Sequence, residues 1–507
     1  MPEVLAQFLM AWTDPTLLGL TALGTFAGIY VGAIPGLSVT MAVSILISFT
    51  YRWDVTEALA LMVGIFMGGV YGGARTAILL NMPGAPAAVA TALDGYPLAQ
   101  KGQAGPAIGL STVMSGVGGF VGIAMLAVAA PAISDFALRF QPRDYLLIAV
   151  LGLVLAGALA RASFAKGLFC AALGILIGSV GLDPLTAQER MTFGQVGLWN
   201  GVSPIVAMIG LFGVAEALRQ IHLQATPRVV EHVRSVLPRW RDLRRYLPLS
   251  LQTSVIGGSI GALPGTGGDI SALIAYDYAR AVTRNPEVSF GAGAKEGLVA
   301  PESANNAAVG GAFIPMLTLG IPGDAVTAIL IGALFIHGLN PGPMLMIETP
   351  YILWFIVGTL CLANVCLMVF GLGGTRLFVR LAQLPRGVLM PVILLLAFVG
   401  AYAISNSVAD IFWVLGFGVL GFFLKVYGFQ VAPVVLGIIL SRLIDDNWRR
   451  MVISEREDLW AVWVKLIASP LSLTLLVAIV LVVLSRTPLA GVLRRQLRRL
   501  SRRQSGP

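Results

Sequence analysis

Residues 291–323 are the part of the sequence best suited to chemistry, because they place polar groups among long apolar runs. The segment contains Glu302, Asn305 and Asn306 together with three prolines and seven glycines. Polar side chains in membrane segments are costly and usually mark the path of a solute or an ion. Backbone interrupted by proline or glycine is tolerated at membrane depth only where protein or a water-filled cavity surrounds it. The segment therefore predicts one half of a transport site.

The composition assigns this segment to a polytopic membrane protein. Of the 507 residues, 57% are hydrophobic and 12% are charged, and the mean hydropathy is +0.85; soluble domains carry about 25% charged residues. A transmembrane helix needs about 20 apolar residues, and the nearly uncharged runs predict about twelve crossings. These runs are 16–50, 58–80, 105–131, 145–160, 202–218, 350–373, 387–404, 408–424 and 466–485. The first run is too long for one straight helix, so Pro35-Gly36 predicts a broken helix or two short helices.

The basic residues set the expected topology. Most of the net charge of +9 comes from a linker at 219–246 and from the tail that begins at Arg486. The positive-inside rule assigns both segments to the cytoplasm. The N-terminal segment up to residue 18 holds Glu3 and Asp14 but no basic residue, which favours an outside N-terminus and predicts no signal peptide. Because the charge follows the membrane topology, we expect no nucleic-acid partner.

The sequence also argues against an enzyme. It contains no Walker loop, no Ser/His/Asp arrangement and no His-Glu-x-x-His helix. Cys170, Cys361 and Cys366 lie in apolar runs without metal-ligand spacing, which predicts inert thiols. We therefore expect no cofactor other than a coupling ion.

An internal repeat links the polar segment to an earlier part of the chain. The motif Gly-Ala-Ile-Pro-Gly at 32–36 recurs as Gly-Ala-Leu-Pro-Gly at 261–265. The motif at 71–74 followed by Pro83-Gly84 recurs at 309–312 followed by Pro322-Gly323. If the first copy starts outside and the second starts from the cytoplasmic linker, the copies are inverted. Inverted repeats with discontinuous helices are a recurrent design of secondary transporters.

These patterns predict an all-α fold with about twelve transmembrane helices in two inverted repeats, containing broken helices or re-entrant hairpins. The expected divisions are a first repeat (1–218), the basic cytoplasmic linker (219–246), a second repeat (247–440), an interfacial loop with the last transmembrane helix (441–485) and a basic cytoplasmic tail (486–507).

The four Pro-Gly breaks supply the candidate substrate ligands. A helix N-terminus freed by a break carries about half a positive charge and unpaired N–H groups, which suit a carboxylate. The alternative is a kink needed only for packing. Asn81 either caps its break or touches solute. The predicted substrate-binding residues are Pro35, Gly36, Ser38, Asn81, Pro83, Gly84, Pro264, Gly265, Thr266, Gly267, Pro322 and Gly323.

Polar residues near the breaks have two interpretations each. Asn305 and Asn306 are sodium ligands or form interhelical hydrogen bonds. Glu302 carries the coupling ion, or is a helix-start residue after a proline; the second interpretation is favoured.

Arg75 is a carboxylate clamp, or pairs with Asp54 or Glu57. Asp324 is expected to cap a helix. Asp94 is expected in a loop turn.

Several longer segments together resemble the large membrane subunit of the tripartite tricarboxylate transporters. They are GAIPGLS at 32–38, YGGARTAILLNMPG at 71–84, ALDGYPLAQKGQAG at 92–105, GALPGTGG at 261–268, PESANNAAVGGAFIPMLTLGIPG at 301–323 and HGLNPGP at 337–343. The resemblance covers roughly residues 16–440, and the segment at 301–323 is its most specific part. The family's breaks fall on the four Pro-Gly pairs, and its Asn-Asn pair falls on Asn305-Asn306. Arg75 and Asp269 depart from the family pattern, which leaves the particular carboxylate open.

The resemblance implies a bacterial inner-membrane, multi-pass permease of the elevator type. It implies two partners, a small four-helix membrane subunit and a periplasmic binding protein, and a di- or tricarboxylate or related organic acid as substrate. The gradient of Na⁺ or H⁺ would drive import. The alternative is a stand-alone carboxylate transporter or exporter without a binding protein.

Overall fold

The computed structural model describes residues 2–34, 37–158, 163–183, 186–223, 236–374, 386–454 and 458–486. These residues are almost entirely helical, with one two-stranded antiparallel pair. They form two compact units, which consist of residues 1–138 with 203–427 and residues 139–202 with 428–507. The expected all-α fold is therefore confirmed.

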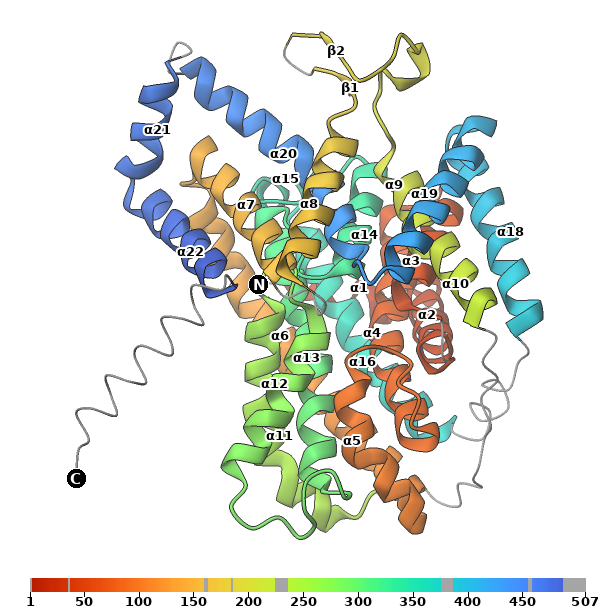
Figure 1. Ribbon diagram of the computed structural model, residues 1–507. Helices are drawn as coiled ribbons and strands as arrows, with labels where there is room; N and C mark the ends of the chain where they lie inside the picture. Colours follow the sequence, from red (N-terminus) through yellow and green to blue (C-terminus); the bar gives the residue numbers. More distant parts are fainter. Residues whose placement is uncertain are drawn as a thin grey trace. The chain divides into compact units, whose positions relative to one another are not determined.

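Unit 1 contains the polar segment and both copies of the repeated motifs (Figure 1). Its first part consists of α1 (Pro2–Thr13), α2 (Pro15–Ala33), α3 (Val39–Thr50), α4 (Val55–Leu80), α5 (Ala88–Leu98), the π-helix η1 (Ala99–Gln103) and α6 (Ala104–Ala137). Its second part consists of α9 (Pro204–Met208), the π-helix η3 (Ile209–Val214), α10 (Ala215–Leu223), α11 (Trp240–Gly261), α12 (Gly267–Val282), α13 (Lys295–Leu319), α14 (Ala325–Ile336), α15 (Leu345–Glu348), α16 (Tyr351–Gly373), α18 (Arg386–Ser405) and α19 (Val408–Val426).

Unit 2 is smaller. It consists of α7 (Pro142–Ala158), α8 (Phe164–Gly178), β1 (Gly181–Leu182), β2 (Glu189–Arg190), the 3₁₀-helix η2 (Val196–Leu198), α20 (Ala432–Ser454), α21 (Leu459–Ala468) and α22 (Pro470–Arg486). In its interior α8 and α20 come within backbone distance, since a Cβ at Gly174 would lie 2.0 Å from the carbonyl oxygen of Val434.

The charged segment of unit 2 is helical where a loop was expected, because α20 continues to Ser454. An ion-pair network holds this end of the helix. Asp445 accepts from Arg190 at 2.9 Å and from Arg449 at 3.1 Å, and Arg449 also pairs with Asp183. Asp445 and Arg449 of this segment are thus paired within unit 2, and their own i,i+4 pair supports a continuous helix. The tail from residue 487 lies outside the described residues.

Six helical segments among the described residues are long and apolar enough to cross a membrane, and one bent pair raises the number to seven. They are Pro15–Ala33, Val55–Leu80, Ala88–Ala137, Pro204–His222, Tyr351–Gly373 and Val408–Val426, with Trp460–Ala468 and Pro470–Arg486 as the bent pair. Four more apolar helices are shorter, and they are Val39–Thr50, Phe164–Gly178, Ala325–Ile336 and Leu389–Ile404. The protein is therefore multi-pass. The expected number of about twelve exceeds the full-length candidates because several apolar runs fold as shorter helices. The run 16–50 is one of them, since it divides into α2 and α3.

The polar segment forms α13, and protein encloses this helix completely. All its residues from 296 to 318 are buried, and α6 and α11 lie beside it (Figure 1). A Cβ at Gly118 would lie 2.1 Å from the carbonyl oxygen of Ser303. One turn later, a Cβ at Gly122 would lie 2.2 Å from that of Ala307. Glycine therefore lets the two backbones touch, as is common between helices in lipid.

The two copies of the repeat pack in the same way. Three close contacts between α2 and α4 have counterparts between α11 and α13, all made by a glycine against the partner's backbone. The pairs are Gly28–Ile65 and Gly257–Ala304, Gly32–Gly69 and Gly261–Ala308, and Gly72–Ile29 and Gly311–Gly258. The two repeats thus build the same local structure, but the contacts pair Gly72 with Gly311, so the motif at 71–74 corresponds to 310–313, one residue later than the sequence comparison predicted.

The helices α4 and α13 also end in the same way. Their C-cap residues, Asn81 and Gly320, are left-handed with φ of 52° and 69°. The cap N–H groups donate to the carbonyl oxygens of Thr76 and Pro315. This is a common way of ending a helix, so the first interpretation of Asn81, a cap, accounts for its conformation. The internal prolines of α13 do not break the helix, which ends only at this cap.

Asp94 joins the two halves of unit 1. Its carboxylate, in α5, is fully buried and accepts hydrogen bonds at 2.8 Å from the N–H groups of Gly291, Gly293 and Ala294. The hydroxyl of Tyr276 donates to its second oxygen at 2.9 Å. The loop turn expected for Asp94 is wrong, because a helix places its side chain against the start of α13.

We predict that Asp94→Ala destabilises the protein by about 3 kcal/mol or more, because it leaves several buried donors unsatisfied. Thermal unfolding of the purified full-length protein in detergent measures the effect. Asp277→Ala is the matched control, since Asp277 is an exposed carboxylate on α12. Equal unfolding temperatures for the two variants would contradict the assigned role of Asp94.

Candidate functional site

The two breaks of the second half lie against one another. One separates α11 from α12, and the other separates α13 from α14. The N–H of Gly265 donates to the carbonyl oxygen of Pro322 at 3.3 Å. A Cβ at Gly267 would lie 3.1 Å from the Cβ of Asp324. The structure therefore brings together the predicted residues of both breaks, Pro264, Gly265, Thr266, Gly267, Pro322 and Gly323.

Asp324 caps α14, as expected. Its carboxylate accepts a hydrogen bond from the N–H of Thr327 at 2.8 Å. In return, the N–H of Asp324 donates to the hydroxyl of Thr327 at 2.8 Å. The N-terminus of α14 is thus already occupied by a carboxylate. The first turn of the neighbouring helix α12 also contains a carboxylate, Asp269, beside N–H groups that have no partner within the helix.

Two predicted substrate-binding residues, Thr266 and Ser38, use their hydroxyls in local hydrogen bonds. Thr266 donates to the carbonyl oxygens of Leu263, at 2.9 Å, and Ile260. Ser38 accepts from the N–H of Met41 at 3.1 Å and so caps α3. Each hydroxyl therefore fixes the chain at its break.

The described part of the first-half breaks is similar. The N–H of Gly84 donates to the carbonyl oxygen of Gly73 at 3.4 Å. A Cβ at Gly84 would lie 2.0 Å from the carbonyl oxygen of Gly32, so only glycine permits this approach. Pro83 is exposed beside it. The other first-half pair, Pro35-Gly36, lies outside the described residues.

Asn305 connects the breaks of the two halves. A Cβ at Gly268, in the first turn of α12, would lie 2.3 Å from Oδ1 of Asn305. The Nδ2 of Asn305 donates to the carbonyl oxygen of Val70 at 3.4 Å. Val70 lies about one turn along α4 from Gly73, the residue that holds the first-half break. The amide of Asn305 therefore lies between elements from both copies of the repeat.

Asn306 belongs to a different environment. It is fully buried, and its Nδ2 donates to the carbonyl oxygen of Glu302 at 3.1 Å within α13. Its Oδ1 accepts no hydrogen bond within the described chain. The two neighbouring asparagines thus face different partners.

Glu302 lies about two turns inside α13, which begins at Lys295, so the favoured interpretation as a helix-start residue is wrong. That interpretation took Pro301 as the start of a helix, but proline is tolerated within helices of membrane proteins, and Pro301 lies inside α13. The carboxylate of Glu302 is 1% exposed and accepts from Thr91 at 2.5 Å and from Ser115 at 2.9 Å. No ion pair of the described chain includes it.

Arg75 caps α16. Its Nη2 donates to the carbonyl oxygen of Gly371, near the C-terminus of that helix, and its Nε and Nη2 donate to the hydroxyl of Tyr71 at 3.1 and 2.8 Å. A cation at a helix C-terminus is stabilised by the last carbonyls. Pairing with Asp54 or Glu57 is wrong, because these residues lie near the opposite end of α4, about 30 Å away. The carboxylate clamp stays a prediction.

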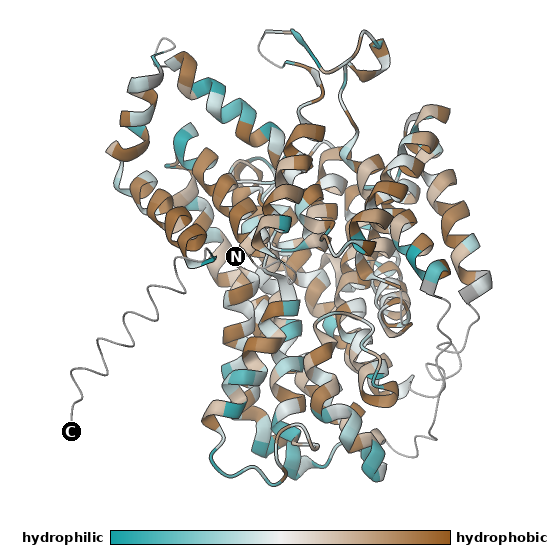
Figure 2. Cartoon of the chain, in the orientation of Figure 1, coloured by the Kyte–Doolittle hydropathy of each residue, from teal (hydrophilic) through white to brown (hydrophobic). Residues whose placement is uncertain are grey.

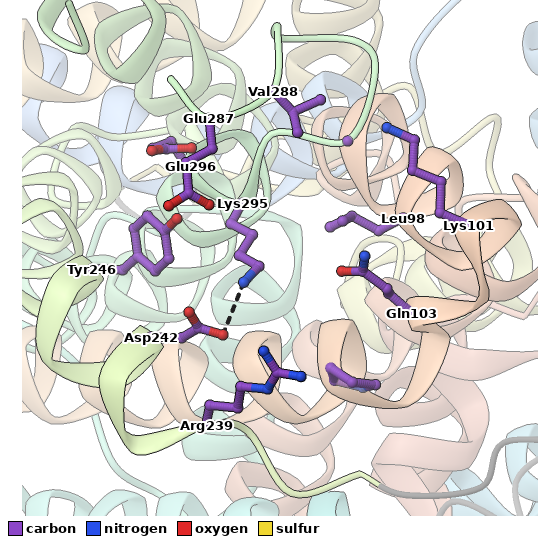
Figure 3. Close-up of a pocket in the computed structure, with 12 residues that line it drawn as sticks. Leu98, Lys101, Gln103, Arg239, Asp242, Tyr246, Glu287, Val288, Lys295 and Glu296 are labelled. Carbon is purple, nitrogen blue, oxygen red and sulfur yellow. Dashed lines mark hydrogen bonds and ion pairs between the residues drawn. The ribbon is translucent and has the colours of Figure 1, made fainter. Parts of the chain in front are cut away.

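A cavity of about 290 Å³ lies at the other end of α13, about 35 Å from the break at Gly320 by helix length. Lys101, Lys295, Glu287 and Glu296 are among the residues that line it, with Lys295 paired to Asp242 at 2.9 Å (Figure 3). Hydrophilic residues gather at this end of unit 1, where α5 ends and α11 begins (Figure 2). Its charges of both signs indicate a water-facing vestibule, separate from the breaks.

Sequence reasoning missed several polar residues that contact the site. They are Tyr71, Thr91, Thr112, Ser115 and Asn364, all buried within unit 1. Each is an uncharged polar residue within a mostly apolar run, where its type alone does not indicate a function. The glycines at 116, 118, 119 and 122 were the indirect signal, because small residues mark close helix contacts.

Broken apolar helices that surround buried amides and a carboxylate define a multi-pass membrane protein of the transporter class. The chain belongs to the tripartite tricarboxylate transporter TctA family, which matches residues 18–436. The resemblance found in the motifs is thus confirmed, and the protein is a membrane transporter associated with tricarboxylate transport.

Two proteins of Agrobacterium vitis are similar to this chain. The first is described as an uncharacterized 52.8 kDa protein in the TAR-I ttuC' 3' region, and it is 36% identical over 86% of this chain and 87% of its own length. The second, described as an uncharacterized protein in the TAR-II ttuC' 3' region, is 37% identical over 40% of this chain and 83% of its own length. No solved structure matches the chain.

We predict that Arg75→Met lowers the stability of the purified protein by about 2 kcal/mol, because hydrogen bonds made by a charged group are lost. Thermal unfolding in detergent measures this loss, and Arg280→Met, at an exposed position of α12, is the control. Unchanged stability together with weakened carboxylate affinity would instead favour the clamp.

Proposed function

We propose that the protein is the large permease subunit of a tripartite, ion-gradient-driven carboxylate importer of the bacterial inner membrane. The contact of Asn305 with elements of both repeats is the observation that carries this proposal. It joins the α12 break to α4, and α12 offers N–H groups to an anion. Family membership supports a small four-helix membrane subunit and a periplasmic binding protein as partners. The substrate is a di- or tricarboxylate or a related organic acid.

Inverted repeats and elevator-type movement are part of the proposal. The rings of Phe66 and Phe313 lie 6.0 Å apart, and Val70 binds Asn305. Residue numbers rise along α4 and fall along α13 between these contacts, as in an antiparallel pair. Such an arrangement of equivalent helices is what inversion across the membrane requires. The shorter apolar helices α3 and α14 would then be halves of re-entrant hairpins, which enter the membrane from one side without crossing it.

An inward ion gradient supplies the driving force. Moving one elementary charge across 100 mV yields about 2.3 kcal/mol, enough for a gradient of about 50-fold. Glu302, Asn305 and Asn306 are the residues proposed to couple Na⁺ or H⁺ to the solute. In this arrangement the basic linker and tail face the cytoplasm and the N-terminus faces outside.

Reconstitution in proteoliposomes with both partner proteins tests the proposal. A ligand screen on the proposed partner binding protein identifies the carboxylate, and its radiolabelled form is then used for uptake. Uptake that requires the binding protein and an inward Na⁺ or H⁺ gradient is the expected result. Uptake without the binding protein would favour the stand-alone transporter or exporter.

We predict that Asn305→Ala lowers this uptake at least about ten-fold, because the solute site loses a buried hydrogen-bonding group between the two repeats. Membrane insertion and the elution volume in size-exclusion chromatography should stay unchanged. Asn285→Ala is the control, since Asn285 is exposed beyond the end of α12. Full uptake by Asn305→Ala would remove this residue from the site.

A further inference from the structure

We infer that Glu302, Asn306 and Asn364 form a sodium-binding site in the groove between α6, α13 and α16. The site would supply the ion coupling proposed above, and its role rests on that function. Asn364 and the groove itself extend the site beyond the ion-coupling residues found by sequence.

Asn364 directs an amide oxygen toward α6. The residue is fully buried, and its Nδ2 donates to the carbonyl oxygen of Gly116 at 2.8 Å. A carbonyl oxygen only accepts hydrogen bonds, so the Nδ2 of Asn364 must face it, and this fixes the orientation of the amide. A Cβ at Gly119 would lie 2.3 Å from Oδ1 of Asn364, so glycine is required there. This Oδ1 accepts no hydrogen bond within the described chain.

Asn306 presents a second oxygen of the same kind. Its Nδ2 is used by the carbonyl of Glu302, and its buried Oδ1 has no donor among the described residues. Buried polar atoms are almost always satisfied, so each exception needs a physical cause such as an ion. The Oδ1 atoms of Asn306 and Asn364 are both buried without a donor, so both require such a cause.

The helix register places Asn306 and Asn364 within about one turn of each other along α6. Gly118 touches Ser303 and Gly122 touches Ala307, so α6 and α13 run parallel and Asn306 is level with the Gly119 turn. Glu302 and Asn306 are four residues apart and share one face of α13.

The face of α13 that carries this pair points to the α16 side of α6. Glu302 reaches Ser115 on α6, and Ser115 lies between the side of α6 that meets α13, at Gly118, and the side that meets α16, at Gly116. Asn306 follows Glu302 on the same side, and Asn364 closes the groove from α16.

The chemistry of this set fits a hard monovalent cation. All the available ligands are oxygens, namely one carboxylate, two amide oxygens and the hydroxyl of Ser115, and hard cations prefer oxygen. A buried carboxylate without a cationic partner is costly, and one Na⁺ would neutralise it. A proton on Glu302 could satisfy at most one acceptor, whereas a bound cation contacts several oxygens at once. The set therefore favours Na⁺ over H⁺.

Binding of ²²Na⁺ to the purified full-length protein, measured by scintillation proximity, tests the site. We expect saturable binding by the wild type and at least ten-fold weaker binding by Asn364→Leu and Asn306→Leu. Asn447→Leu is the matched control, because Asn447 is also a buried asparagine but lies on α20 in unit 2, so its replacement should leave sodium affinity unchanged. Asn364→Asp keeps an oxygen of the same size and should retain binding, so it tests the site even if the leucine variants do not fold.

Three results would overturn the assignment. They are wild-type affinity in Asn364→Leu, loss of binding in Asn447→Leu equal to that in Asn306→Leu, and loss of binding by a folded Asn364→Asp. Carboxylate uptake by the same preparations separates this site from the proposed function. Import without ²²Na⁺ binding would refute the sodium site alone. Asn364-dependent ²²Na⁺ binding without import of any carboxylate would refute the proposed function alone.

Discussion

The architecture of unit 1 depends on keeping α13 away from lipid. A helix with a carboxylate, two adjacent asparagines and internal prolines is unstable in hydrocarbon. There, each polar group without a hydrogen-bond partner costs several kcal/mol of free energy. The solution is backbone contact with α6 and α11, made possible by glycines such as Gly122 and Gly257. Because these contacts leave no room for lipid tails, α13 can hold polar groups at membrane depth. Transport chemistry is possible in this protein only because that enclosure is complete.

Features set by adjacent residues were predictable from the sequence. The break at Pro322-Gly323 and the cap formed by Asp324 follow from local backbone preferences. The repeated motifs also indicated that α4 and α13 belong to equivalent elements, and their packing agrees pair by pair. Local signals therefore led to the correct breaks. Local signals did not predict that the hydroxyls of Thr266 and Ser38 form hydrogen bonds with the nearby backbone.

Features set by distant residues were not predictable. Glu302 resembled a helix start because Pro301 precedes it, and only tertiary structure reveals its hydroxyl donors. Arg75 resembled an isolated cation, although its partner carbonyl is 296 residues away in sequence. Asn364 is one amide in a long apolar run. Such partners depend on which helices pack together and at what level along their axes, and a single sequence does not show this.

The bonds of Asp94 have a consequence for biogenesis. Its carboxylate is synthesised 197 residues before the first backbone N–H that it binds. During translation the first half of unit 1 therefore carries an acidic group without its partners, and that half cannot reach its final packing until α13 has entered the membrane. A chain that stops before this helix therefore leaves the Asp94 carboxylate without its three backbone donors, so the two halves of unit 1 acquire their final packing together.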